Sequence, residues 1–207
     1  MTARLKLAEL ISARLCHDLA GSLGTLTASL EIVAEGGADA AEALEIAQDS
    51  AKGMNARLRF VRAAWAVDGA THDGAALLDY CAPLPQARKV SFDFAQLVGS
   101  FSVSMSRGLL NLLLLGIESL PRGGAITLAG DQVSGAVMSI KGAHAAWPDG
   151  FAALLCETES AWTGLRDSRT LQAPLTALIL GQCGLRLRFL MAGGDPGSPP
   201  PVLLVQE

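Results

Sequence analysis

The sequence predicts an α+β protein: an N-terminal helical hairpin, expected to form a dimeric four-helix bundle, followed by an α/β sandwich. Two observations predict this fold class. Residues 1–67 show helical periodicity only, whereas from about residue 74 short alternating segments typical of strands are interleaved with helical ones. We therefore expect two domains, 1–67 and 68–207, with residues 68–71 as the linker. A chain of 207 residues is long enough for both.

The first domain is predicted from two apolar stripes. Apolar residues from Leu7 to Val33 recur in steps of three and four, and Gly36-Gly37 should end this helix. Asp39 can cap a second helix, in which Leu44 to Trp65 follow a heptad pattern. One hairpin cannot cover both stripes well, so we expect two copies to bury them in a four-helix bundle. The expected seam between the copies consists of Leu15, Leu19, Leu26, Leu30, Ala47, Met54, Leu58 and Val61.

The second domain is predicted from alternating strand and helix patterns. Residues 102–119 are apolar nearly all round, which indicates a deeply buried helix. Residues 90–94 alternate as a strand, and the turn at 121–124 precedes an antiparallel pair. The other expected elements are helices at 75–81, 149–155 and 171–182 and strands at 125–128, 136–140, 185–190 and 202–205. These elements fit one sheet with helices on one face.

Composition excludes several classes of protein. Half of the residues are apolar, but the longest apolar segment, 109–117, is far shorter than the roughly 20 residues of a membrane-spanning helix. The N-terminal segment contains charged residues throughout, so it is not a secretory signal. The net charge of −4 argues against nucleic acid as the main partner. The four cysteines are far apart, which favours reduced thiols in a cytoplasmic protein over a disulfide framework or a zinc site.

Of three histidines, one is a candidate for chemistry. His72 lies in the linker, where we expect a solvated side chain, and His144 follows a strand with no obvious partner. His17 is two residues from Leu15 and two from Leu19. At about 100° per residue it therefore lies almost opposite the buried stripe and should be exposed.

The helical neighbours of His17 are unusually small. Each glycine inside a helix costs about 1 kcal/mol relative to alanine, which suggests that another protein must approach the ring closely. Asp18 can orient or deprotonate the ring, and Arg14 offers a cation for an incoming phosphoryl group. The alternative is a surface histidine without a function. The expected docking surface consists of Ala13, Ala20, Gly21 and Gly24.

These residues resemble a known family. Residues 12–21, Ser-Ala-Arg-Leu-Cys-His-Asp-Leu-Ala-Gly, resemble the phosphoacceptor helix of ChpT-type histidine phosphotransferases and, more distantly, the His-Glu-Leu motif of sensor histidine kinases. Residues 57–65 resemble the second bundle helix of that family. Residues 110–113 with 121–124 are similar to a helix and turn of the kinase nucleotide domain, and residues 171–187 to its late helix and strand. The resemblance covers essentially the whole chain in order.

The resemblance implies that the second domain is a degenerate Bergerat-type ATPase domain. In kinases, two asparagines stand one helical turn apart, and the second of them holds magnesium. If Asn111 corresponds to the first asparagine, the position of the second is Leu115. The strand that would supply the adenine-binding carboxylate ends in Lys141, and no Gly-x-Gly lid follows. We therefore expect no cofactor and no metal site in this chain. Gly21 stands where kinases carry the Thr or Asn of their phosphatase motif, which argues against an autonomous phosphatase activity.

The resemblance also implies a reaction. A histidine phosphotransferase of a phosphorelay would move a phosphoryl group from the aspartate of a donor receiver, through His17, to the aspartate of a response regulator. In the resembling family the donor is a hybrid histidine kinase and the acceptors are of the CtrA and CpdR kind, and each receiver brings its own magnesium. We expect a homodimer that binds neither nucleic acid nor membrane. Two alternatives remain: a non-catalytic dimeric scaffold that docks response regulators, and an ATP-dependent histidine kinase, which the lost nucleotide residues disfavour.

Overall fold

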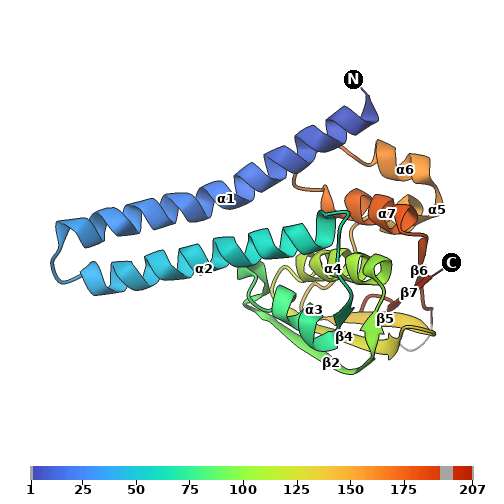
Figure 1. The fold of residues 1–207 in the computed structure, drawn as a ribbon. Helices are drawn as coiled ribbons and strands as arrows, with labels where there is room; N and C mark the ends of the chain where they lie inside the picture. The colour runs from blue at the N-terminus through green and yellow to red at the C-terminus, as the bar shows by residue number, and fades with distance from the viewer. Residues whose placement is uncertain (1, 192–197, 207) are drawn as a thin grey trace.

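A long helical hairpin projects from a mixed α/β part (Figure 1). The computed structural model describes residues 2–191 and 198–206. The hairpin consists of α1 (Ala3–Glu35) and α2 (Ala40–Trp65), and its closed end lies far from the sheet. Within the two described ranges, no helix is both long and apolar enough to cross a membrane.

The turn of the hairpin lies where the glycine pair predicts it. Gly36 has a φ of 76°, which favours glycine, and its N–H donates to the carbonyl of Val33 at the end of α1. Asp39 occupies the N-cap position of α2, but its side chain accepts no hydrogen bond there, so the predicted capping interaction is wrong. Packing between α1 and α2 stabilises the hairpin, and small residues allow the two helices to approach closely. Those buried between them in the distal part are Ser29, Ala43 and Ala47.

The α/β part contains a five-stranded sheet with the strand order β2-β4-β5-β7-β6. Strands β2 and β4 are parallel and are connected through α4, whereas all other pairs are antiparallel. The pairing of β4 with β5 confirms the predicted antiparallel pair. The bounds are β2 (Val90–Val98), α4 (Val103–Glu118), β4 (Gly124–Asp131), β5 (Gly135–Lys141), β6 (Leu185–Phe189) and β7 (Val202–Gln206).

Several elements differ from the prediction. Strand β2 extends four residues beyond 90–94, and a two-stranded sheet of β1 (His72–Asp73) and β3 (Ser100–Phe101) was not expected. Both short strands lack an alternating pattern long enough to be recognised. The helices are α3 (Gly74–Cys81), η1 (Pro85–Ala87), α5 (Phe151–Cys156), α6 (Thr158–Thr163) and α7 (Gln172–Gln182), of which η1 and α6 were also unexpected.

The unpredicted sheet changes the environment of His72. Only 9% of this residue is exposed, its backbone N–H donates to Ser106 Oγ at 2.9 Å, and its ring lies 5.1 Å from that of Tyr80. The expectation of a solvated linker side chain is therefore wrong. Burial lowers the pKa of His72, against the opposing charge of Asp73, so the ring is a neutral packing group.

Helix α4 forms the centre of the core, as its all-round apolar sequence predicts. It lies between the sheet and the hairpin, with α7 beside it (Figure 1). A Cβ added to Gly108 would lie 2.5 Å from a Leu185 methyl group, so the helix approaches the sheet closely there. The fully or nearly fully buried residues of α4 include Leu109, Leu110, Leu112, Leu113, Leu114 and Leu115.

The open end of the hairpin packs against α7. In this contact Leu7, Leu10 and Ile11 of α1 lie against the buried cluster of Leu165, Leu171, Leu175 and Ile179. Trp65 at the end of α2 also contacts this cluster, and its Nε1–H donates to Asn111 Oδ1 at 3.1 Å. Together these contacts set the next turns of α1, which carry residues 14–18, beside the end of α4.

Candidate functional site

His17 lies on the outer face of the hairpin. Its side chain is 75% exposed, as predicted from its position opposite the apolar stripe. Ring atom Nδ1 lies 3.4 Å from Oδ1 of Asp18, the next residue along the helix. The ring is therefore accessible to a partner and has a carboxylate on its Nδ1 side.

The predicted docking residues surround His17 without covering it. Ala13, Ala20, Gly21 and Gly24 are all exposed. A Cβ added at Gly21 or Gly24 would meet nothing within 4 Å. Packing within this chain therefore does not require glycine at either position.

Asp18 is held by two arginines. Its side chain is only 14% exposed, and its Oδ2 accepts hydrogen bonds from Arg14 Nε at 2.9 Å and from Arg57. Burial acts to raise the pKa of Asp18, but the hydrogen bond from Arg14 and the charge of Arg57 outweigh it and hold this pKa below its ordinary value. The carboxylate therefore stays ionised at neutral pH, which suits orientation of the ring better than removal of its proton.

Arg14 connects α1 to the α/β part. Its guanidinium donates to Glu118 at the end of α4 and to the backbone carbonyls of Ser168, at 3.2 Å, and Arg169, at 3.5 Å. Sequence reasoning assigned this charge to an incoming phosphoryl group. The structure places it in an ion-pair network beside His17, with two carboxylates as neighbours. Burial raises the pKa of Glu118, and the charge of Arg14 opposes that shift.

Arg57 and Gln86 complete this network, and sequence reasoning missed both. Arg57 donates to Gln86 Oε1 at 2.8 Å as well as to Asp18. Asp18 lies 17 residues before the end of α1, and Arg57 lies 17 residues after the start of α2. Because the two residues are equally far from the turn of the hairpin, they face each other across the two helices. Once the turn is located, this equal spacing in the sequence could have predicted the pair. We call Arg14, Asp18, Arg57, Gln86 and Glu118 the Asp18 network.

The two positions that the resemblance to kinases assigns to nucleotide binding, Asn111 and Leu115, are both buried in the core. Leu115 is 1% exposed and packs in a cluster with Phe151 and Ala173. Asn111 is fully buried: its Nδ2 donates to the carbonyls of Ala64 and Arg107, and its Oδ1 accepts from Trp65 and Gln172. Its amide is therefore committed to the core. Within the described residues, no group of three His, Cys, Asp or Glu side chains could hold a metal ion.

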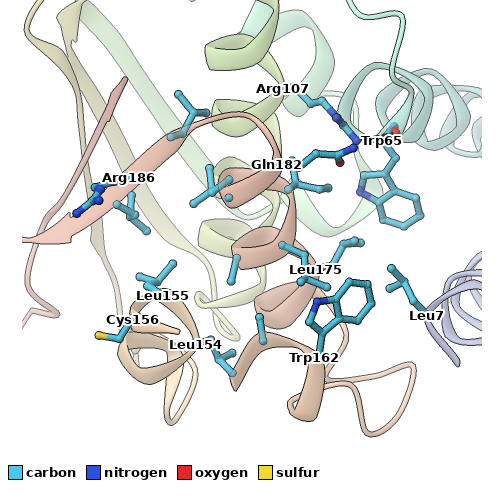
Figure 2. Close-up of a pocket in the computed structure, with 18 of the residues that line it drawn as sticks. Leu7, Trp65, Arg107, Leu154, Leu155, Cys156, Trp162, Leu175, Gln182 and Arg186 are labelled. Carbon is cyan, nitrogen blue, oxygen red and sulfur yellow. Dashed lines mark hydrogen bonds between the residues drawn. The ribbon is translucent and has the colours of Figure 1, made fainter. Parts of the chain in front are cut away.

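A pocket of about 1160 Å³ lies around α7, separate from the His17 site. Figure 2 shows Leu7, Trp65 and Trp162 on one side of α7, and Leu155 and Arg186 on the other. Its lining combines apolar side chains with those of Arg4, Arg107, Arg186 and Arg188, and it does not include His17. A smaller groove of about 560 Å³ lies against the Asp18 network and continues to Pro148 and Thr170.

Comparison with known proteins identifies the family of this chain. Residues 82–195 match the family model of the histidine phosphotransferase C-terminal domain. The chain belongs to the histidine phosphotransferase family. The phosphotransferase is 28% identical over 197 residues to the protein phosphotransferase ChpT of Brucella abortus (strain 2308), an alignment that covers 92% of this chain and 93% of the relative.

A solved structure gives the same result for the fold. The phosphotransferase superimposes on a bacterial phosphotransferase determined at 1.7 Å with a TM-score of 0.72 and 26% identity, covering 99% of this chain and 97% of the other. The family resemblance and the α+β fold expected from the sequence are thereby confirmed. So is the expected activity, phosphotransfer of the phosphorelay type.

Proposed function

We propose that His17 is the phosphoacceptor of this phosphotransferase. In the forward step His17 Nε2 attacks the phosphorus of an aspartyl phosphate on a donor receiver, the phosphorus–carboxylate bond breaks, and the aspartate leaves as a carboxylate. Phospho-His17 then gives the group to the aspartate of a response regulator. The observation that carries this proposal is the 75% exposed His17 ring beside the fixed carboxylate of Asp18.

The partners follow from this chemistry and from the family. We assign the donor to the receiver domain of a hybrid histidine kinase and the acceptors to response regulators of the CtrA and CpdR kind, in the cytoplasm. Each receiver supplies its own magnesium ion, and the phosphotransferase contributes the nucleophile and its orientation. Because phosphoryl transfer passes through a loose transition state, catalysis depends mainly on positioning and charge.

The receiver approaches over the small residues of α1. With Gly21 one turn after His17 and Gly24 one turn further, no side chain stands between the ring and an incoming domain. Ala13 and Ala20 extend this surface of small side chains on both sides of His17. The surface lets a receiver's aspartate come within bonding reach of the ring.

A homodimer is the second part of the proposal. Leu30 and Leu58 remain 47% and 50% exposed in one chain, and Leu23 and Leu44 are similarly exposed. At about 100° per residue, Leu23 and Leu30 lie roughly 120–140° around α1 from His17, so a partner hairpin on this stripe leaves the histidine free. Ala47, which the sequence placed at the seam, is already buried within a single hairpin. The remaining stripe forms the inner face of a four-helix bundle.

The α/β part is proposed to be a degenerate ATPase domain without nucleotide. Its support is the apolar packing of Leu115 and the full engagement of the Asn111 amide described above. The phosphotransferase would then depend on receivers for its phosphoryl group and would bind no cofactor of its own.

One labelling experiment tests the proposed function. A receiver phosphorylated on its aspartate is mixed with wild-type phosphotransferase and, separately, with His17→Ala. We expect stoichiometric labelling of the wild type and none of the variant, with the same thermal stability, since an exposed side chain contributes little to folding. Binding of the receiver without labelling of the wild type would favour a non-catalytic scaffold.

A further inference from the structure

We propose that Arg57 is a positioning residue that sets the tautomer of His17 through Asp18, and that the α/β part supports this arrangement through Glu118 and Arg14. The inference rests on the proposed role of His17 as the phosphoacceptor. It assigns a function to the ion pair between the two helices of the hairpin and to the contact between the hairpin and α4.

The two oxygens of Asp18 have different partners. Oδ2 accepts from both Arg14 and Arg57, whereas Oδ1 lies 3.4 Å from His17 Nδ1. Because two guanidinium groups from different helices hold Oδ2, the carboxylate cannot turn about its own axis without losing both charge-assisted hydrogen bonds. Oδ1 is thereby kept on the Nδ1 side of the ring.

A fixed carboxylate at Nδ1 selects one form of a neutral imidazole. The carboxylate accepts a hydrogen bond from Nδ1–H, so the lone pair stays on Nε2. Nε2 is the ring nitrogen directed away from Asp18, where an aspartyl phosphate can reach it. The depressed pKa of Asp18 keeps the acceptor ionised while this happens.

Arg57 is placed for this role rather than for packing. Its side chain is 15% exposed and is held at one end by Gln86 Oε1, at 2.8 Å, and at the other by Asp18. Among the described residues, its Nε is the buried side-chain nitrogen or oxygen that lacks a hydrogen-bond partner. A buried, unpaired donor costs free energy, so the site gives up stability to keep a guanidinium at this position.

Arg14 depends on the α/β part for its own position. Glu118 accepts from one end of its guanidinium, and the carbonyls of Ser168 and Arg169 accept from another nitrogen. These contacts come from α4 and from the segment that precedes α7. A domain without nucleotide-binding residues therefore still acts on the phosphoacceptor, by holding one of the two arginines that fix Asp18.

The test compares Arg57→Gln and Arg57→Lys with Arg62→Gln, an exposed arginine of the same helix that serves as the matched control. Transfer from a phosphorylated receiver is followed by rapid quench at increasing receiver concentration. We expect Arg57→Gln to lower the saturating rate about tenfold to a hundredfold without changing the half-saturating receiver concentration, because Arg57 faces the hairpin interior. Arg57→Lys should retain part of the rate, and Arg62→Gln all of it.

Nitrogen-15 NMR of the His17 ring gives the readout that a purely structural role would not move. We expect the Nδ1–H tautomer in the wild type and a shift toward Nε2–H in Arg57→Gln. A predominant Nε2–H tautomer in the wild type would overturn the inference even if Arg57→Gln failed to fold. A full transfer rate in Arg57→Gln would also overturn it, and would leave the proposed function intact. Absence of label on the wild type, or label on His17→Ala, would instead refute the proposed function.

Discussion

Arg14 of α1 donates a hydrogen bond to Glu118, the last residue of α4. Arg14 lies one helical turn before the exposed His17 on α1. Arg14 and Glu118 are separated by 104 positions in the chain. Their contact joins α4 of the α/β part to α1, the helix that carries the proposed nucleophile His17. It therefore gives the α/β part a direct structural link to the proposed site of phosphotransfer.

The two carboxyl groups of this network should affect stability in opposite directions as pH changes. Burial raises the pKa of Glu118 above its ordinary 4.5, so its ionisation costs stability at neutral pH, and that cost disappears as pH falls through the raised value. Asp18 has a pKa below its ordinary 3.8, so its contribution is present above that value and is lost as pH falls below it.

Denaturant unfolding between pH 7 and pH 3 measures both effects. Relative to wild type, Glu118→Gln should lose the gain in stability that appears on acidification toward pH 4.5. Asp18→Asn should be less stable than wild type at neutral pH. It should also lack the decrease in the free energy of unfolding that the wild type shows as pH falls below 3.8. Identical pH dependence in all three proteins would show that the Asp18 network does not contribute to the free energy of unfolding.

Gly21→Leu should block phosphotransfer while the fold is retained. A leucine side chain one turn from His17 projects over the same face and keeps a receiver's aspartate out of reach, and a misplacement of about 1 Å can cost a hundredfold in rate. A Cβ at Gly21 meets nothing within 4 Å, and leucine is a better helix former by roughly 1 kcal/mol. The melting temperature should therefore stay the same or rise.

The matched control for that experiment is Glu31→Leu, which changes an exposed residue further along the same helix. Labelling by a phosphorylated receiver is measured for both variants. Unimpaired labelling of Gly21→Leu would mean that receivers do not approach over this face. A sharp drop in its stability would instead identify Gly21 as a residue of an interface with a second copy.

Leu30→Glu combined with Leu58→Glu should dissociate the homodimer. Both side chains are about half exposed in one chain, so burying the remainder of each in a bundle is worth roughly 0.8–1.5 kcal/mol, which a charged replacement loses. Sedimentation velocity at low micromolar concentration measures the change. The control is Val133→Glu, because Val133 is 90% exposed in the turn between β4 and β5. A folded wild-type monomer at that concentration would contradict the proposed bundle.

The wild-type phosphotransferase should bind neither ATP nor ADP. In the proposed degenerate ATPase domain, Leu115 stands where a kinase would carry a magnesium ligand. Its 1% exposure within an apolar cluster leaves no space for a metal–phosphate group. Isothermal titration calorimetry with Mg-ATP should give no binding heat, and incubation with labelled ATP no label on His17. Micromolar binding would show that other groups have rebuilt the site.

The sequence was sufficient for the elements whose pattern is long and local. The stripe of α1, the heptads of α2 and the all-round apolar α4 each span several helical turns, so their type and approximate ends follow from periodicity. Residues 12–21 also identified the family, and the position of His17 opposite the stripe predicted its exposure. The two-residue strands β1 and β3 were missed because their pairing, not their own sequence, creates them.

What the tertiary structure alone decided is the set of contacts around His17. Asp18 is adjacent to the histidine in sequence, but the partners that fix it, Arg57 and Arg14, take their positions from Gln86 and Glu118 on other elements. No local pattern encodes such pairs, because an ion pair depends on the register of two helices and on the angle at which the hairpin meets α4. Helical periodicity determines which face a residue occupies; only packing between distant segments determines which charge it faces.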